Sequence, residues 1–157
     1  MIIKIYNYSI MITIFGRPIW NSPQKLISYS LDDENTSKQV FDIYSFSHIT
    51  HGIICYFILQ SLHIKPLNGL VITIIVETLW EIIENSEYII NKYRKTYKLY
   101  EGDSIVNILG DIIFTIIGYI LAYTYPFVAI IYTILLEIVL YPYKASLLQL
   151  SILQLVN

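Results

Sequence analysis

Residues 103–125 read DSIVNILGDIIFTIIGYILAYTY, an almost unbroken apolar run that stops at Pro126. The run is long enough for a helix that crosses a bilayer, which takes about 20 residues. The whole chain shares this character, since 55% of its 157 residues are hydrophobic and 14% are charged. Soluble domains carry roughly 25% charged residues. Together with a mean hydropathy of +0.57, this composition predicts an integral membrane protein.

The expected fold is all-α, a polytopic bundle of transmembrane helices that forms a single domain over residues 1–157. Apolar runs separated by turn-forming residues predict four spans. The spans cover about residues 42–62, 67–88, 103–125 and 127–141. Because the connections at Pro66 and Pro126 are short, adjacent spans are expected to be antiparallel.

The remaining segments are less regular. Residues 1–15 are apolar but short, and we interpret them either as an interfacial segment or as an extra span. Residues 16–41 contain glycine, prolines and a charged run, which predict a surface loop. Residues 145–157 form a tail, for which a short surface helix is one interpretation.

Basic residues in the connection over residues 91–102 decide the expected topology. They are Lys92, Arg94, Lys95 and Lys98. Cytoplasmic loops are enriched in Lys and Arg, so we expect this connection on the cytoplasmic side of a multi-pass protein. The expected location is the plasma membrane or, in a bacterium, the inner membrane. Tyrosines alternate with the basic residues, which is typical of contact with lipid headgroups.

Net charge and cysteine content exclude some classes of function. A formal net charge of −2 and a pI near 5.9 give no general basic field, which argues against nucleic acid as a partner. The lipid bilayer is the expected partner instead. Cys55 is the single cysteine of the sequence, which excludes an intrachain disulfide and a metal cage built from cysteines.

Ionisable side chains inside the expected spans are the most informative residues. Each costs about 2.5–3.5 kcal/mol at the centre of a membrane helix, so such groups are usually functional or paired. The spans contain carboxylates and imidazoles but neither Lys nor Arg: His48, His51, Glu77, Glu81, Glu84, Asp103, Asp111 and Glu137. Protons, bound cations or flanking basic residues must therefore balance the negative charge.

These polar residues form one stripe on each of the first three spans, because residues three or four positions apart share a helix face. The two histidines are three positions apart, and the three glutamates follow steps of four and three. Asp103, Asn107 and Asp111 follow steps of four. With antiparallel spans and a rise of about 1.5 Å per residue, the stripes are expected to meet in the cytoplasmic half of the bilayer.

Imidazoles and carboxylates that converge in a helix bundle are ligands that zinc, iron or manganese prefers. We therefore expect a divalent metal as cofactor. The expected ligands are His48, His51, Glu81 and Asp111. The candidate catalytic groups are Glu77, Glu84 and Asp103, with Ser47, Asn85 and Asn107 as supporting polar residues. A metal-bound water and a neighbouring carboxylate, Glu77 or Glu84, would then transfer protons.

Simpler interpretations of the same residues stay open. His48 and His51 could form hydrogen bonds between helices, and Asp103 could cap the N-terminus of its helix. Glu84 could be solvated at the membrane interface. Gly110 and Gly118, eight positions apart on one helix face, indicate close helix packing.

Three blocks of the sequence resemble the bacterial domain-of-unknown-function 2585 family. They are DIYSFSHITHG at Asp42–Gly52, ETLWEIIENS at Glu77–Ser86 and GDSIVN at Gly102–Asn107. The resemblance covers about residues 16–140 and implies a small multi-pass membrane protein without an established activity. The pattern of Asp103, Asn107 and Gly110 is also similar, more distantly, to VanZ-like membrane proteins, which favours lipid or envelope amphiphiles as ligands.

The leading hypothesis is a metal-dependent hydrolase or transferase that acts on a lipid or lipid-linked substrate. The sequence leaves open whether the protein is an enzyme. One alternative is a transporter or channel subunit for protons or divalent cations, which also needs buried acids. Another is a non-catalytic interaction protein whose polar stripes bind helices together. A homo-oligomer that completes the cavity also stays open.

Overall fold

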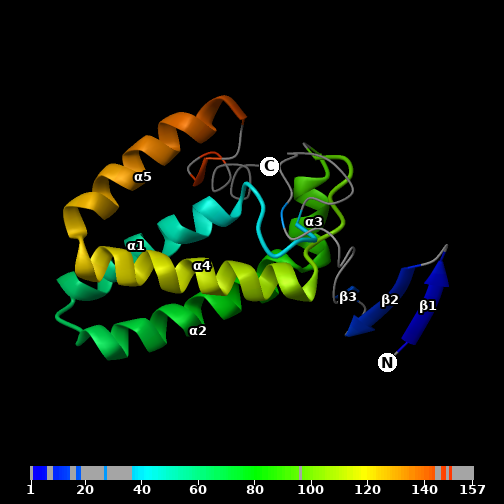
Figure 1. Ribbon diagram of the computed structural model, residues 1–157, viewed down its shortest axis with the longest axis horizontal. Coiled ribbons are helices and arrows are strands. Elements are labelled where there is room, and N and C mark those ends of the chain that lie inside the picture. Colours follow the sequence, from blue (N-terminus) through cyan, green and yellow to red (C-terminus); the bar gives the residue numbers. More distant parts are fainter. Residues whose placement is uncertain are drawn as a thin grey trace.

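The computed structural model describes residues 2–6, 9–14, 17–18, 27, 37–95, 97–143, 146, 147 and 149. The helices within these residues are α1 (Ser45–Ser61), α2 (Pro66–Glu84), α3 (Glu87–Tyr93), α4 (Ile105–Thr124) and α5 (Pro126–Leu140), followed by the 3₁₀ helix η1 (Tyr141–Tyr143). Figure 1 shows α1, α2 and α4 running alongside one another, α5 diverging from them, and α3 at one end of the bundle.

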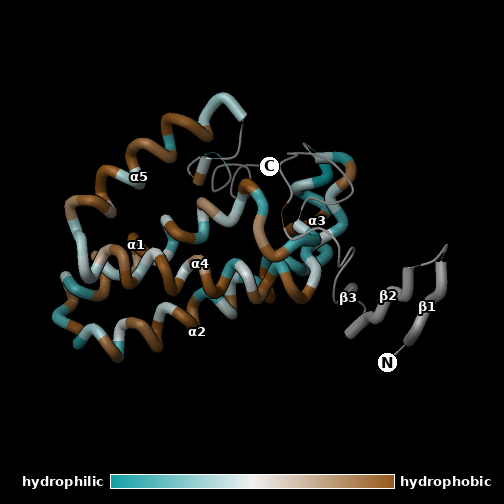
Figure 2. Tube along the Cα trace, viewed as in Figure 1, coloured by the Kyte–Doolittle hydropathy of each residue, from teal (hydrophilic) through white to brown (hydrophobic). Residues whose placement is uncertain are grey.

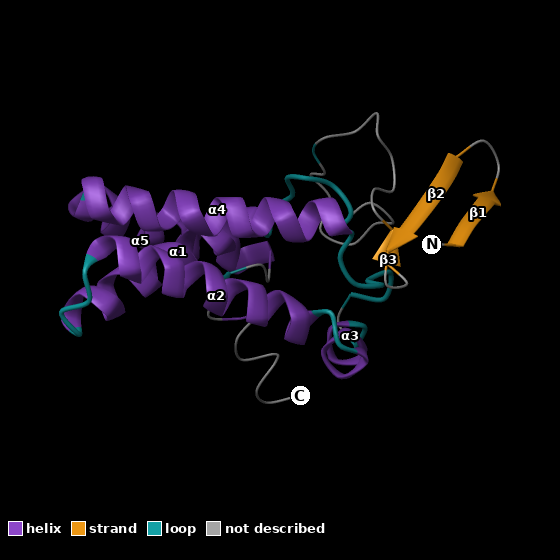
Figure 3. Ribbon diagram, turned by 90° about the horizontal axis from the view of Figure 1, so that it is seen from below, coloured by secondary structure: helices purple, strands orange, loops and turns teal. Residues whose placement is uncertain are grey.

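Three short strands precede the helices. They are β1 (Ile2–Tyr6), β2 (Ser9–Ile14) and β3 (Arg17–Pro18), and they form an antiparallel sheet in the order β1-β2-β3 (Figure 3). Repeated isoleucines favour extended backbone over helix, because a β-branched side chain fits a pleated surface well. These residues are therefore strands, and the extra transmembrane helix considered for residues 1–15 is wrong.

The all-α prediction is confirmed for the body of the chain, where the elements from Ser45 to Tyr143 are all helices. Most of the expected surface loop over residues 16–41 lies outside the described residues. Its last part crosses the start of α4, where the Ser104 N–H donates to the Ser37 carbonyl over 2.9 Å. The surface helix considered for the tail also lies largely outside the described residues.

The number of membrane-spanning helices differs from the prediction. Among the described residues, three helices are long and apolar enough to cross a membrane, over Pro66–Glu84, Ile105–Thr124 and Pro126–Tyr143. Four spans are therefore not supported, because α1 has only 17 residues and a polar first half. At about 1.5 Å per residue α1 is about 26 Å long, shorter than a hydrocarbon core of about 30 Å.

Helix α1 is polar because it lies inside the bundle. It packs most extensively against α4 and also contacts α2 and α5 (Figures 1 and 3). Its buried residues are Ser45, Ser47, His48, Thr50, Gly52 and Ile53. The surrounding helices keep this polar surface away from lipid, so α1 does not need the apolar composition of a lipid-facing helix.

The surrounding helices carry most of the exposed apolar surface, to which α1 adds Ile54 and Ile58. Ile75 of α2, Ile113 of α4 and Ile131 of α5 are each more than half exposed, as suits side chains that face lipid. Figure 2 shows hydrophobic residues along these helices and hydrophilic residues gathered around α3 and its connections.

Local sequence sets the ends of the helices. Pro66 and Pro126 occupy first-turn positions of α2 and α5, where the missing proline N–H has no intrahelical partner to lose. Ser86 and Ser104 cap α3 and α4 by accepting backbone N–H groups. Helix α2 ends at Glu84 rather than at about residue 88 as expected, because Ser86 caps the separate helix α3, which starts at Glu87.

Two glycines bring α1 and α4 into backbone contact. A Cβ atom at Gly118 of α4 would clash with the Ile49 carbonyl, and one at Gly52 of α1 would clash with the Thr115 carbonyl. Gly110 approaches the Val40 carbonyl in the same way. The prediction of close helix packing is therefore confirmed for Gly118, whereas Gly110 packs against the segment before α1. Gly52 is the partner of Gly118 that the sequence analysis missed.

Replacing Gly118 with alanine should destabilise the bundle by about 3 kcal/mol, the upper end of typical overpacking costs, because the clash is with backbone. Thermal unfolding in detergent measures the effect. Ile113→Ala is the control, since Ile113 lies on the same helix and its side chain is 54% exposed. Equal melting temperatures for the two variants would contradict the close contact.

Candidate functional site

His48 lies at the centre of a buried polar group between α1, α2 and α4. Its Nδ1 atom lies 2.6 Å from Glu77 Oε1 and 3.7 Å from Glu81 Oε1. Its Nε2 atom lies 3.7 Å from Asp111 Oδ2. All four side chains are buried. With His51 they form what we call the histidine–carboxylate cluster, and it joins the polar stripes of three helices as the sequence predicted.

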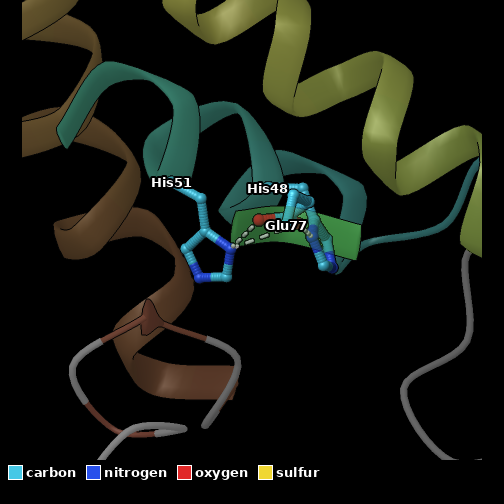
Figure 4. Close-up of side chains that lie close together, drawn as sticks. All are labelled: His48, His51 and Glu77. Atoms are coloured by element: carbon cyan, nitrogen blue, oxygen red, sulfur yellow. Dashed lines mark hydrogen bonds and ion pairs between the residues drawn. The ribbon is translucent and has the colours of Figure 1, made fainter. Parts of the chain in front are cut away.

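The Glu77 carboxylate contacts the Nδ1 atoms of both histidines (Figure 4). His51 Nδ1 lies 3.4 Å from Glu77 Oε1 and 3.3 Å from Oε2, on the other side of the carboxylate from His48. The two imidazole rings meet edge to face with centroids 5.1 Å apart. His51 is the most accessible member of the cluster, with 22% of its side chain exposed, and its ring contacts Trp80.

Glu81 is the unusual member of the cluster. It is 2% exposed, and neither carboxylate oxygen has a hydrogen-bond partner among the described residues. A buried carboxylate without hydrogen bonds is costly, because it loses hydration without replacement. The group therefore needs a proton or a cation near it, and His48 is the nearest basic side chain.

Hydroxyl groups on neighbouring turns position the other members. Thr115 Oγ1 donates to the His48 carbonyl over 3.0 Å, directly beside the glycine contacts. Ser45 Oγ donates to Asp111 Oδ1 over 3.2 Å, which leaves the Oδ2 atom facing His48. Both bonds join α1 to α4, so the packing of these two helices fixes the distance between His48 and Asp111.

In the part of the chain that the structure describes, two sets of side chains have the composition and spacing to hold a metal ion. One is His48, His51 and Glu77, and the other is His48, Glu81 and Asp111. In each set one ligand atom from every residue lies within 4.8 Å of the others. His48 belongs to both sets. The four expected ligands therefore do not form one set, because His51 is grouped with Glu77 rather than with Glu81 and Asp111.

A second polar group joins the end of α2 to the start of α4. Asn85 Nδ2 donates to Asp103 Oδ2 over 2.6 Å, and the Asp103 N–H donates to Asn85 Oδ1 over 2.8 Å. The Tyr100 hydroxyl donates to Asp103 Oδ1 over 3.1 Å. Burial raises the pKa of Asp103, and burial together with the nearby Asp103 carboxylate raises the pKa of Tyr100 well above its usual range.

The remaining predicted residues have structural contacts. Asp103 does not cap α4, because Ser104 is the capping residue. Ser47 donates to the Tyr44 carbonyl within its own helix turn, and Asn107 donates to the Gln39 carbonyl. Glu84 is half-buried at the end of α2, and Glu137 lies apart from the cluster, where it accepts the Leu147 N–H.

A family model described as a protein of unknown function (DUF2585) matches residues 12–157. The chain belongs to the DUF2585 family. It is similar to the UPF0314 protein of Brucella anthropi, at 40% identity over 106 residues that cover 65% of this chain and 54% of the relative. The UPF0314 protein of Sphingopyxis alaskensis is 39% identical over 99 residues, 59% of this chain and 52% of the relative.

The DUF2585 chain spans about half the length of these curated relatives. No solved structure matches it. The expected family and its lack of an established activity are confirmed. The more distant resemblance to VanZ-like proteins stays a prediction.

Sequence reasoning missed three residues of this DUF2585 site. Ser45 lies three positions before His48, and Thr115 lies four positions after Asp111, so both share a helix face with a predicted ligand. That spacing could have identified them. Asp42 accepts N–H groups of Ser37, Tyr44 and Ser45. It lies before the first residue of α1, so helical spacing does not identify it.

Asn85→Ala should destabilise the DUF2585 chain by about 1–3 kcal/mol, because it removes a donor from the buried Asp103 carboxylate. Chemical denaturation in detergent measures this change. The control is Asn68→Ala, which alters an exposed asparagine on the same helix and should leave stability within about 0.5 kcal/mol of the parent. Equal losses for both variants would contradict a stabilising role for the Asn85–Asp103 pair.

Proposed function

We propose that this chain is a metal-dependent hydrolase or transferase that acts on a lipid or lipid-linked substrate through the histidine–carboxylate cluster. The observation that carries the proposal is the buried Glu81 carboxylate, which has no hydrogen-bond partner among the described residues and faces His48. A bound cation would satisfy this group and would also offset the charges of Glu77 and Asp111.

The donor types support a catalytic rather than a structural cation. One imidazole with two carboxylates suits zinc, iron or manganese, and three protein ligands leave coordination positions for water and substrate. A bound divalent cation can lower the pKa of a water molecule to about 7 and polarise an ester or phosphoester oxygen. Glu77 and the half-buried Glu84 are then the nearby carboxylates that could accept a proton.

A substrate from the bilayer is supported by the surroundings of the site. The helices that enclose the cluster expose large apolar residues, among them Leu79 and Ile83 of α2. His51 and Trp80 mark its most accessible edge, between α1 and α2. A lipid or lipid-linked molecule could therefore approach this edge without leaving the membrane. The basic connection after α3 supports the cytoplasmic leaflet as the side of entry.

The purified chain should bind one transition-metal ion. Glu81→Gln should weaken metal binding by at least about 100-fold, because it replaces a charged carboxylate ligand with a neutral amide of the same size. Elemental analysis after dialysis in detergent gives the metal content, and circular dichroism checks folding. Glu87→Gln is the matched control, since Glu87 is an exposed glutamate on α3.

Activity is then tested with lipid esters and lipid phosphoesters, with and without the metal that the analysis finds. Turnover that requires this metal and disappears in Glu81→Gln but not in Glu87→Gln is the expected result. A folded wild-type chain that binds no transition metal would overturn the proposal.

Cation translocation is the second candidate, and one observation favours it. Beyond Glu81, the carboxylates of Glu84 and Asp103 lie close enough to interact with it electrostatically, so acidic groups continue from the cluster toward the α3 end of the bundle. A translocated proton or divalent cation would pass along such a series of acids.

This candidate predicts proton or divalent-cation flux in proteoliposomes, and Glu77→Gln should abolish it by removing the charge that faces both histidines. A pH-sensitive or cation-sensitive dye inside the vesicles measures the flux. Glu87→Gln vesicles provide the control. Vesicles that contain folded wild-type protein but show no flux above empty vesicles would exclude this candidate.

A further inference from the structure

The two possible metal sets of the cluster share His48, and the position of Glu77 distinguishes them. His48 Nδ1 and Glu77 Oε1 are 2.6 Å apart. Two ligands on one ion, each at about 2.0–2.2 Å from it, lie about 3 Å or more from each other. The shorter separation is that of a direct charge-assisted hydrogen bond. His48 Nδ1 and Glu77 are therefore bonded to each other rather than jointly bound to one cation.

This hydrogen bond determines which nitrogen of His48 is available. When Nδ1 of His48 carries the proton and donates a hydrogen bond to Glu77, Nε2 is unprotonated and its lone pair is available to a metal ion. Nε2 lies 3.7 Å from Asp111 Oδ2, the oxygen that Ser45 leaves free. If these two atoms moved slightly closer, their separation would match the distance of about 3 Å or more between two ligands on one ion.

Glu77 also restrains His51. Its carboxylate accepts from His51 Nδ1 at 3.3 and 3.4 Å, so one acidic group contacts two imidazoles through the same type of nitrogen. His51 lies on the accessible side of Glu77, whereas Glu81 and Asp111 lie near His48. Among the described residues, the carboxylate in contact with His51 is therefore that of Glu77.

We infer that a divalent transition-metal ion is held by His48 Nε2, Asp111 and Glu81, and that Glu77 is a positioning residue that fixes the tautomer and orientation of His48. The Glu81 Oε1 atom lies 3.7 Å from His48 Nδ1, so this carboxylate turns toward the Nε2 side of the ring when it binds the ion. His51 is then a neighbour of the site and not a ligand. This inference rests on the proposed metal-dependent function and specifies its ligands. A carboxylate that accepts from the non-ligating nitrogen of a metal-bound histidine typically improves metal affinity by about 10–100-fold.

The test is titration of cobalt(II) into the folded, metal-free full chain in detergent, followed by its visible absorption spectrum. Glu81→Gln and Asp111→Asn should each weaken cobalt binding by more than about 100-fold. Glu77→Gln keeps an oxygen that can accept from His48, so affinity should fall only about 10–100-fold and the cobalt spectrum at saturation should keep the wild-type band positions. Glu77→Ala should bind more weakly than Glu77→Gln.

His51→Ala and Glu87→Gln should stay within about 3-fold of the wild-type affinity, and circular dichroism should show folded protein for every variant. If His51→Ala and Glu77→Gln abolish binding while Glu81→Gln spares it, the ion is held by His48, His51 and Glu77, and this inference is wrong although a metal site exists. If the folded wild-type chain binds no cobalt, zinc, iron or manganese, the proposed function fails as well.

Discussion

Backbone contact between α1 and α4 is the constraint on which the polar cluster depends. Gly52 and Gly118 let the two helices approach until side-chain atoms at either position would overlap the facing carbonyl groups. At this separation Thr115 reaches the His48 carbonyl and Ser45 reaches Asp111. A wider spacing would break both hydrogen bonds. The relative position of the imidazole and the carboxylate is thus set by glycine packing, because the two backbones meet at Gly52 and Gly118 without a side chain between them.

The same packing explains why α1, the most polar of the four long helices, lies in the middle. Polar groups inside a membrane protein are tolerated where other helices cover them. Helix α1 contacts α2, α4 and α5, and these three supply most of the apolar surface that is suited to face lipid. The arrangement reverses the usual order of a soluble protein, since the exterior of the bundle is apolar and the interior carries imidazole, carboxylate and hydroxyl groups.

Much of this arrangement could be predicted from the sequence, because helical periodicity places residues three or four apart on one face. That rule is sufficient to predict that His48, Glu77, Glu81 and Asp111 lie close together. It could not show that Glu77 would bond to both histidines, since the rotation of neighbouring helices is set by packing. The apolar runs also overestimated the number of membrane spans, because hydropathy does not distinguish a helix that faces lipid from one that lies largely between other helices. The strands near the N-terminus were missed for a related reason: short isoleucine-rich segments are compatible with either helix or strand.

The enclosed position of α1 has a consequence for how the protein is made. Helix α1 leaves the ribosome before α2, α4 and α5, the helices that will cover its polar side. On its own it is short and carries two histidines and several hydroxyl groups, so its transfer from the translocon into lipid is unfavourable. We therefore expect stable insertion of α1 to depend on its packing against the later helices. Membrane integration and tertiary folding would then be coupled for this protein, and a chain interrupted before α4 would leave its first helix without the neighbour that it packs against most extensively.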